Sequence, residues 1–310
     1  MIVDAHAHVF PEVRGMTARG QVRGRGFGRV SIGTEVHQLM PPAFDGTAFT
    51  TETLLASMDW AGVDKAVLLQ GPFYGECNEY VAAACRAHAD RLVGVAYLDP
   101  WSTDARAAFD SVAGKGIFKG LKLECTVDTG LLGLHPGARL DEDSLSWLWD
   151  ALERLGWALV LDLGKPGSAS YQTGAARAIA ASHPRLRTVI AHLWQPGPWL
   201  HGDARAEELW REQVSLARLA NVWLDTAALP NYHPEDEYPW ARAAASLRRA
   251  VEMVGARKIL WGTDIPGLLP CGTYPQLRRH VEHALAFLPG PEREAIFGAS
   301  ACEVFGITPG

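Results

Sequence analysis

The chain has 310 residues, of which 48% are hydrophobic and 21% are charged, and its formal net charge is -6 at pH 7. These values are typical of a globular protein with a large core, and they argue against a nucleic-acid partner, which favours a basic surface. No apolar run approaches the ~20 residues of a membrane-spanning helix, and no secretory signal is recognisable, so we expect no membrane partner. The five cysteines are widely spaced without a Cys-x-x-Cys pair, which favours a reducing cytoplasm over a disulfide framework.

Apolar segments that read as strands alternate along the chain with segments that read as helices. The first strand ends at His8, and a Gly- and Arg-rich segment follows it over residues 11–46. We interpret that segment as an irregular loop insertion because it is polar and broken, and such insertions are commonly lids or binding loops. Further strands are expected at residues 65–70, 92–98, 118–123, 157–163, 186–191, 222–225 and 258–262. Helices are expected at residues 50–61 (with Thr51 as the N-cap), 78–89, 103–113, 144–155, 170–182, 207–219, 239–254, 274–288 and 291–305.

The order of these elements predicts an α/β fold with one domain over residues 1–310. Strands that alternate with helices imply parallel pairing, and eight such units close into a (β/α)8 TIM barrel. A doubly wound open sheet is the competing architecture, but no Gly-x-Gly-x-x-Gly follows the first strand. An open sheet would also separate the first and eighth strands too far for their polar residues to share an ion.

Two histidines close the first strand, which reads Ile-Val-Asp-Ala-His-Ala-His. Residues two apart on a strand face the same side, so His6 and His8 project together, as two imidazoles that share one metal ion do. Alone, the pair is a weak signal, because His-x-His also occurs by chance in loops. Two later apolar strands, however, end in the potential ligands His192 and Asp264. The C-terminal strand ends of a barrel converge on one mouth, where active sites lie.

These residues together resemble the amidohydrolase superfamily, with Asp264 in the sequence Trp-Gly-Thr-Asp-Ile-Pro. The branch that the chain most resembles contains aminocarboxymuconate-semialdehyde decarboxylase, the resorcylate-type decarboxylases and related hydrolases, and the resemblance covers nearly the whole chain. It implies a divalent metal, usually zinc, held at the barrel mouth by His6, His8 and Asp264. It also implies that Asp264 accepts a proton from the metal-bound water and that His192 is an acid/base group, an electrophilic group or a further ligand.

The chain departs from this pattern at the end of the fifth strand, where the family generally carries a histidine ligand and this sequence has Asp162. A carboxylate can ligate zinc, although an oxygen-rich site also suits manganese or iron. We therefore expect one divalent ion, zinc or else manganese or iron, bound by His6, His8, Asp162 and Asp264. The departure keeps two alternatives open: a metal-free lactonase, of which the superfamily has examples, and a barrel that only binds a ligand.

Five further polar or aromatic residues are candidates for substrate contacts. Lys122 and Glu124 share one face of the fourth strand, where binuclear relatives carry a bridging lysine or glutamate, although the two side chains can equally form a salt bridge. His135 and His233 fall in loops on the mouth side, and Trp194 follows the sixth strand. Loop residues of these types are also commonly solvated or packed against other loops.

The expected activity is hydrolysis of an amide, lactone or ester bond in a small, ring-bearing or carboxylated substrate. A metal ion lowers the pKa of bound water and polarises a carbonyl, and a carboxylate such as Asp264 moves the proton. A non-oxidative decarboxylase, which is a lyase, is the alternative on the same metal site. The expected partner is therefore a small molecule, and a homodimer would agree with the resembling family and with the general preference for symmetric assemblies.

Overall fold

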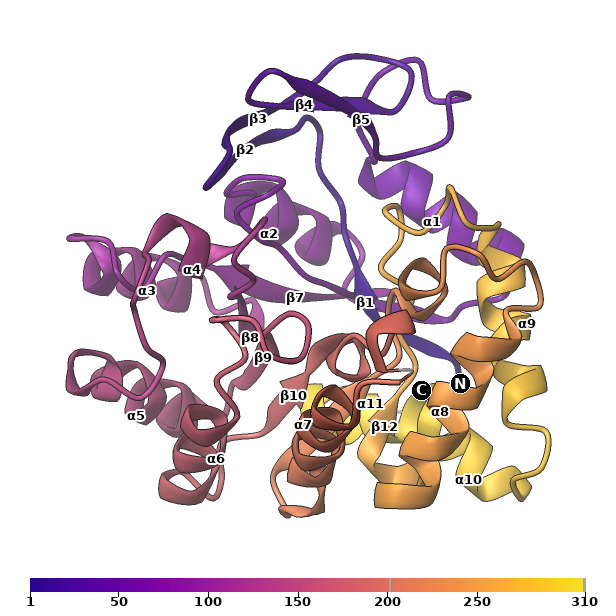
Figure 1. Ribbon diagram of the computed structural model, residues 1–310. Helices are drawn as coiled ribbons and strands as arrows, with labels where there is room; N and C mark the ends of the chain where they lie inside the picture. The colour runs from indigo at the N-terminus through magenta and orange to yellow at the C-terminus, as the bar shows by residue number, and fades with distance from the viewer. Residues whose placement is uncertain (201, 309–310) are drawn as a thin grey trace.

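The computed structural model describes residues 1–200 and 202–308, and a parallel sheet forms its centre (Figure 1). Within the described residues the sheet has eight strands, ordered β1-β6-β7-β8-β9-β10-β11-β12. They are β1 (Val3–Ala7), β6 (Lys65–Leu68), β7 (Leu92–Tyr97), β8 (Phe118–Glu124), β9 (Ala158–Asp162), β10 (Thr188–Ile190), β11 (Val222–Asp225) and β12 (Ile259–Leu260). The ring closes where Ala5 N donates to Trp261 O at 2.9 Å and Asp264 N donates to His6 O at 2.8 Å. The predicted (β/α)8 barrel is confirmed.

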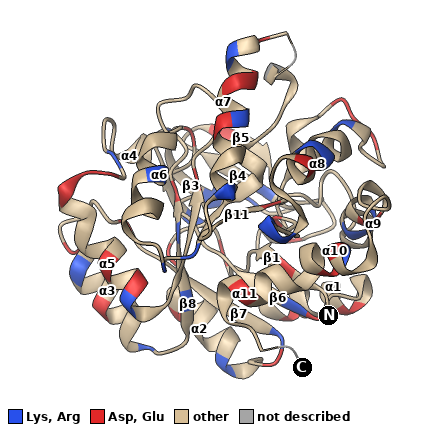
Figure 2. Cartoon of the chain, turned by 90° about the horizontal axis from the view of Figure 1, so that it is seen from below, with Lys and Arg blue, Asp and Glu red and all other residues tan. Residues whose placement is uncertain are grey.

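Helices surround the sheet, and Figure 2 shows charged residues at positions along many of these helices. They are α1 (Thr51–Ala61), α2 (Asn78–Ala87), α3 (Ala105–Gly114), α4 (Leu131–Leu134), α5 (Ser146–Leu155), α6 (Thr173–Ser182), α7 (Ala204–Val214), α8 (Ala241–Val254), α9 (Tyr274–Ala284), α10 (Gly290–Glu294) and α11 (Ser300–Phe305). None of these helices, over the described part of the chain, has the length and apolarity needed to cross a membrane.

The N-cap of α1, the start of α7 and the continuity of the last expected helix differ from the prediction. Thr50, not Thr51, is the N-cap of α1, because its side chain accepts the backbone N–H of Thr53. Helix α7 begins three residues earlier than predicted because the Asp203 carboxylate caps its first N–H groups. The helix expected over residues 291–305 is interrupted by a π-helical turn, Ala295–Ala299, between α10 and α11.

The strands are buried along most of their length, as in other barrels whose faces are both covered, although Lys119 of β8 is exposed. All residues of β1 and β9 are buried, including the polar ones near their ends. Apolar side chains from most strands form a cluster with α11, and a larger cluster joins the strands to the surrounding helices. The polar groups at the C-terminal strand ends are therefore held by a rigid, close-packed frame.

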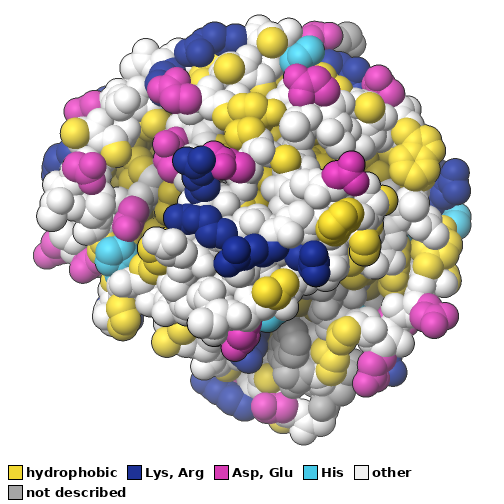
Figure 3. Space-filling view, turned by 90° about the horizontal axis from the view of Figure 1, so that it is seen from above, with side chains coloured by type: hydrophobic (Ala, Val, Ile, Leu, Met, Phe, Trp, Pro, Cys, Tyr) yellow, Lys and Arg dark blue, Asp and Glu magenta, His cyan; other side chains and the backbone are white. Residues whose placement is uncertain are grey.

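The insertion after β1 contradicts the prediction of an irregular loop. Within residues 11–46, four strands form an antiparallel sheet: β2 (Arg14–Thr17), β3 (Gly20–Gly24), β4 (Arg29–Ile32) and β5 (Glu35–Gln38). Val22, Val30 and Ile32 are buried on one face, whereas the arginines alternate onto the other. Figure 3 shows a row of basic side chains on the outer surface above this sheet. The packing of the sheet is tight, since Gly15 approaches Phe73 O so closely that a Cβ would not fit.

Candidate active site

His6 lies on β1 and His8 directly follows that strand, and each ring has its Nδ1 beside an oxygen acceptor. His6 Nδ1 lies 2.9 Å from Asp225 Oδ2, and His8 Nδ1 lies 2.9 Å from the carbonyl oxygen of Leu69. Because a carboxylate oxygen only accepts, His6 Nδ1 carries the proton and His6 Nε2 carries a lone pair, whereas His8 has an acceptor beside each ring nitrogen, Leu69 O at Nδ1 and Asp264 Oδ1 at Nε2. Burial lowers the pKa of His6 and of His8, so both rings are neutral at pH 7.

Asp264 lies in the segment after β12 and faces both His6 and His8, and these three residues form the first side of the site. Its Oδ1 lies 2.9 Å from His8 Nε2 and 3.7 Å from His6 Nε2. Its side chain is 24% exposed whereas those of His6 and His8 are 0% and 2% exposed, so Asp264 is the member of the trio that meets solvent. Burial acts to raise the pKa of Asp264, but the contacts with His8, His6 and His192 outweigh it and lower the pKa to about 2. The carboxylate is therefore ionised.

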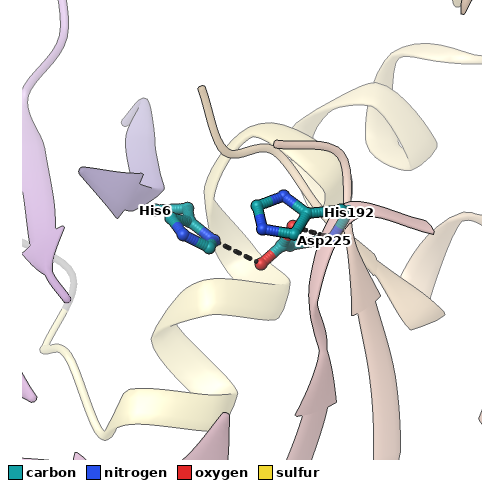
Figure 4. Close-up of side chains that lie close together, drawn as sticks. All are labelled: His6, His192 and Asp225. Carbon is teal, nitrogen blue, oxygen red and sulfur yellow. Dashed lines mark hydrogen bonds and ion pairs between the residues drawn. The ribbon is translucent and has the colours of Figure 1, made fainter. Parts of the chain in front are cut away.

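The trio fits a divalent metal ion. The potential ligand atoms of His6, His8 and Asp264 all lie within 4.8 Å of one another. Two neutral imidazole nitrogens and a carboxylate oxygen are ordinary zinc ligands, and metal-binding histidines usually donate their other N–H to an oxygen, as both do here. A second group, His6 with His192 and Asp225, meets the same distance (Figure 4), but its carboxylate is already occupied by N–H donors.

His192 has the opposite protonation pattern. Its Nδ1 lies 3.2 Å from the carbonyl oxygen of Ala227, and its Nε2 lies 3.3 Å from Asp162 Oδ2. Both neighbours are acceptors, so both ring nitrogens carry protons and the ring is an imidazolium. Burial acts to lower the pKa of His192, but the charge and hydrogen bond of Asp162 outweigh it and raise the pKa to about 9.

Asp162 therefore lies at the predicted strand end but faces His192 in this structure. Its Oδ2 contacts the imidazolium, and its Oδ1 accepts the backbone N–H of Gly164 at 3.1 Å. Neither of the two groups of ligand atoms found in the described residues includes Asp162.

Sequence reasoning missed Asp225, which connects the two sides of the site. Asp225 Oδ2 accepts the ring N–H of His6, and its Oδ1 accepts the backbone N–H groups of His192 at 2.8 Å and Ala227 at 3.0 Å. Figure 4 shows Asp225 between the two histidines. The available signal was the same as for Asp162, an aspartate that ends an apolar strand.

The fourth strand places two ionisable groups beside the trio. Lys122 Nζ lies 3.3 Å from His6 Nε2, so the ammonium meets the lone pair of that ring. Glu124 accepts a hydrogen bond from the Thr129 hydroxyl at 2.8 Å. Burial raises the pKa of Glu124 to about 7, so this carboxyl group is partly protonated at neutral pH. Both side chains are buried in the barrel.

The aromatic walls of the site differ from those proposed from the sequence. Trp194 is only 1% exposed and packs its ring against Tyr171, with ring centroids 5.4 Å apart. Tyr74 and Tyr232, which the sequence analysis did not single out, lie beside the site: the Tyr74 ring is 4.8 Å from that of His8, and the Tyr232 ring is 6.1 Å from that of His192.

The two loop histidines have different surroundings. His135 Nε2 pairs with Asp99 Oδ2 at 2.7 Å and remains partly exposed. His233 is buried in the loop after β11.

Comparisons with known proteins identify the family and similar folds. The family model described as Amidohydrolase matches residues 3–307. No curated protein matches the chain. The chain resembles a zinc-bound amidohydrolase structure from Burkholderia multivorans (TM-score 0.70, 16% identity, covering 99% of this chain and 100% of that chain). It also resembles a probable 2-pyrone-4,6-dicarboxylic acid hydrolase from Acinetobacter baumannii solved with citric acid (TM-score 0.69, 17% identity, covering 98% of this chain and 99% of that chain).

A third solved structure, 5-carboxyvanillate decarboxylase from Sphingomonas paucimobilis, is similar at a TM-score of 0.54 with 18% identity over 82% of each chain. At these identities the solved structures establish the barrel fold, and their reactions differ. The match of the family model over residues 3–307 goes further, and it shows that the chain belongs to the amidohydrolase family.

Proposed function

We propose that the protein is a metal-dependent hydrolase that cleaves an amide, lactone or ester bond in a small, ring-bearing or carboxylated substrate. One observation carries the proposal: the potential ligand atoms of His6, His8 and Asp264 all lie within 4.8 Å of one another, with His8 Nε2 2.9 Å from Asp264 Oδ1. His6 Nε2 presents a lone pair to the same place, since its Nδ1 donates to Asp225.

A divalent ion held by His6, His8 and Asp264 would polarise the scissile carbonyl and lower the pKa of water. Zinc is the first candidate, supported by the zinc in the Burkholderia multivorans structure, with manganese and iron as alternatives. In this proposal Asp162 stays with His192 and is not a ligand, which revises the four-residue ligand set expected from the sequence.

Asp264 and His192 divide the proton transfers. Asp264 is ionised and is the partly exposed member of the trio, so it takes a proton from the attacking water. The oxygen of that water forms the new bond to the carbonyl carbon. His192 gives its Nε2 proton to the leaving atom as the scissile bond breaks, and the proton on Asp264 then restores His192 through solvent. The sum is the addition of one water molecule.

The surroundings of the site support a planar, carboxylated substrate. Tyr74 and Tyr232 present aromatic rings beside the histidines, and such rings suit a flat ring. The Lys122 ammonium and the His192 imidazolium are cations that attract a carboxylate. The Acinetobacter baumannii structure is named for a pyrone dicarboxylate, which is a cyclic ester with two carboxyl groups.

A metal-free lactonase is the second candidate, and Lys122 is the observation that favours it. Its ammonium lies 3.3 Å from His6 Nε2 and donates to the lone pair that a metal ion would use. In that case Lys122 and His192 together supply the positive charge that stabilises the oxyanion.

The test combines metal analysis with a substrate panel. Protein purified without added ions is analysed for metals next to the His6→Ala/His8→Ala double variant, and both are assayed on lactones, aryl esters, amides and carboxylated phenols. We expect about one equivalent of metal that the double variant loses, and hydrolysis that chelation abolishes and added zinc restores. Hydrolysis by metal-free protein would establish the second candidate, and release of CO2 from a carboxylated phenol would make the protein a decarboxylase.

A further inference from the structure

The segment that follows β10 has an unusual backbone. His192, Leu193, Trp194 and Gln195 all have positive φ values, of 62°, 44°, 61° and 51°. Gln195 N donates to His192 O at 2.8 Å, which closes a turn with Leu193 and Trp194 at its two centre positions. Turns with positive φ at both centre positions favour Gly, Asn or Asp, because a Cβ in this conformation approaches the following carbonyl oxygen. The backbone conformation of this turn therefore costs free energy, because none of its four residues is a glycine.

Packing holds the turn in place. Leu193 and Trp194 are almost completely buried. The carbonyl oxygen of Leu193 accepts the indole N–H of Trp210 at 2.9 Å, and the Trp194 ring contacts Tyr171. Strained backbone that the surrounding structure holds so firmly is found mainly at functional sites. A functional role is therefore expected for a side chain that this turn positions.

The turn brings both of its end residues to the same carboxylate. Gln195 Nε2 donates to Asp162 Oδ1 at 3.1 Å, and His192 Nε2 contacts Asp162 Oδ2 at 3.3 Å. The backbone N–H of Gly164 donates to the same Oδ1 at 3.1 Å. With Oδ1 occupied by two donors, the carboxylate plane is fixed and Oδ2 is the oxygen left for His192.

We propose that Gln195 is a positioning residue whose side-chain amide orients Asp162 so that its Oδ2 faces His192 Nε2, and that the left-handed turn exists to bring the amide there. Gln195 itself touches neither substrate nor the reacting atoms. The consequence for catalysis rests on the proposed function, in which the Nε2 proton of His192 goes to the leaving group. The orientation of Asp162 does not depend on that function.

Two substitutions separate the effect of the Gln195 side-chain amide from the effect of the strained backbone. Gln195→Met keeps the length of the side chain and removes the donor, whereas Gln195→Gly removes the donor and also the cost of the positive φ. Gln172→Met is the control: Gln172 is a buried glutamine, whereas Gln195 is half-buried, and its side chain makes two hydrogen bonds, from Leu140 N to its Oε1 at 2.9 Å and from its Nε2 to Ala138 O at 3.0 Å. Those bonds lie outside the site.

The readouts are crystal structures, thermal unfolding, and kcat and KM on the best substrate of the panel. We expect Gln195→Met and Gln195→Gly to rotate Asp162 away from His192 and to lower kcat by about 10- to 100-fold, with KM unchanged within about threefold. Gln195→Gly should unfold at a higher temperature than Gln195→Met although both lose activity. Gln172→Met should unfold at a lower temperature than the wild type and keep its kcat.

The proposal is overturned if Asp162 keeps its orientation in both Gln195 variants, or if both retain the kcat of the wild type. If the wild type turns over no member of the panel, the proposed function fails, but the crystal structures still decide the role of Gln195. If Gln195→Met does not fold, Gln195→Gly provides the same comparison without the strained side chain.

Discussion

The two sides of the site use the same residue types for opposite chemistry. On one side, His6 and His8 donate hydrogen bonds from Nδ1 to Asp225 and Leu69 and turn Nε2 toward Asp264. On the other, His192 lies between the Ala227 carbonyl and Asp162 and holds a proton on each nitrogen. The first side can hold a cation, and the second side is itself a cation. The partner of each ring nitrogen, not the histidine alone, sets this difference.

Loss of the Asp264 carboxylate should produce the largest effect, because it removes both a ligand and the proton acceptor of the first side. We expect Asp264→Asn to lower kcat by about 10²- to 10⁴-fold. Stability should change little, since Asn tolerates the positive φ of 67° at this position. Steady-state kinetics and thermal unfolding check this, and an unchanged rate would remove Asp264 from the mechanism.

His280 provides a reference outside the site, a buried histidine whose ring hydrogen-bonds a backbone carbonyl. It lies 2.7 Å from Pro239 O through Nδ1, and burial lowers its pKa to about 4. Between this value and the ordinary 6.5, the unfolded chain binds the extra proton, so stability falls as pH falls through that window. The contribution is about 3 kcal/mol. Chemical denaturation from pH 7 to pH 4 should show a shallower loss in His280→Gln than in the wild type; parallel curves would contradict this.

Asp162→Asn tests whether Asp162 acts on His192 and is not a metal ligand. An amide does not hold the imidazolium, so the proton on His192 Nε2 is lost and kcat should fall by about 10- to 100-fold. The metal content should stay that of the wild type. A variant that loses its metal would instead show that Asp162 is a ligand, as the sequence alone suggested.

Lys122→Met has the smallest expected effect and distinguishes the two candidate functions. Removing a positive charge 3.3 Å from His6 Nε2 should tighten metal binding by about tenfold while the hydrolysis rate stays within a few-fold of the wild type. Competition with a chromophoric chelator measures the affinity. Loss of hydrolysis without any change in metal binding would favour the metal-free lactonase.

The barrel and the first side of the site could be predicted because both depend on local pattern. Apolar runs define the strands, and the parity of His6 and His8 places both rings on one face. The same pattern placed Asp162 and Asp264 at strand ends. It does not tell which atom each polar group meets, and so the pairing of Asp162 with His192 and the role of Asp225 followed only from the packed structure.

Two other features could not be predicted, for different physical reasons. The insertion after β1 has strands of only four or five residues interleaved with glycine and arginine, so its alternation was hidden in a composition typical of loops. The turn at residues 192–195 carries Leu193 and Trp194 where turn chemistry favours glycine or asparagine. There, burial of two large side chains outweighs backbone preference, and only tertiary structure reveals that balance.

The most direct test of the central claim is anomalous diffraction from crystals of the protein, measured above and below the zinc absorption edge. We predict one anomalous peak between His6 Nε2, His8 Nε2 and Asp264 Oδ1, with Asp162 still directed at His192. A map without a peak after zinc soaking, with Lys122 Nζ ordered against His6 Nε2, would contradict the claim that the first side holds a metal ion.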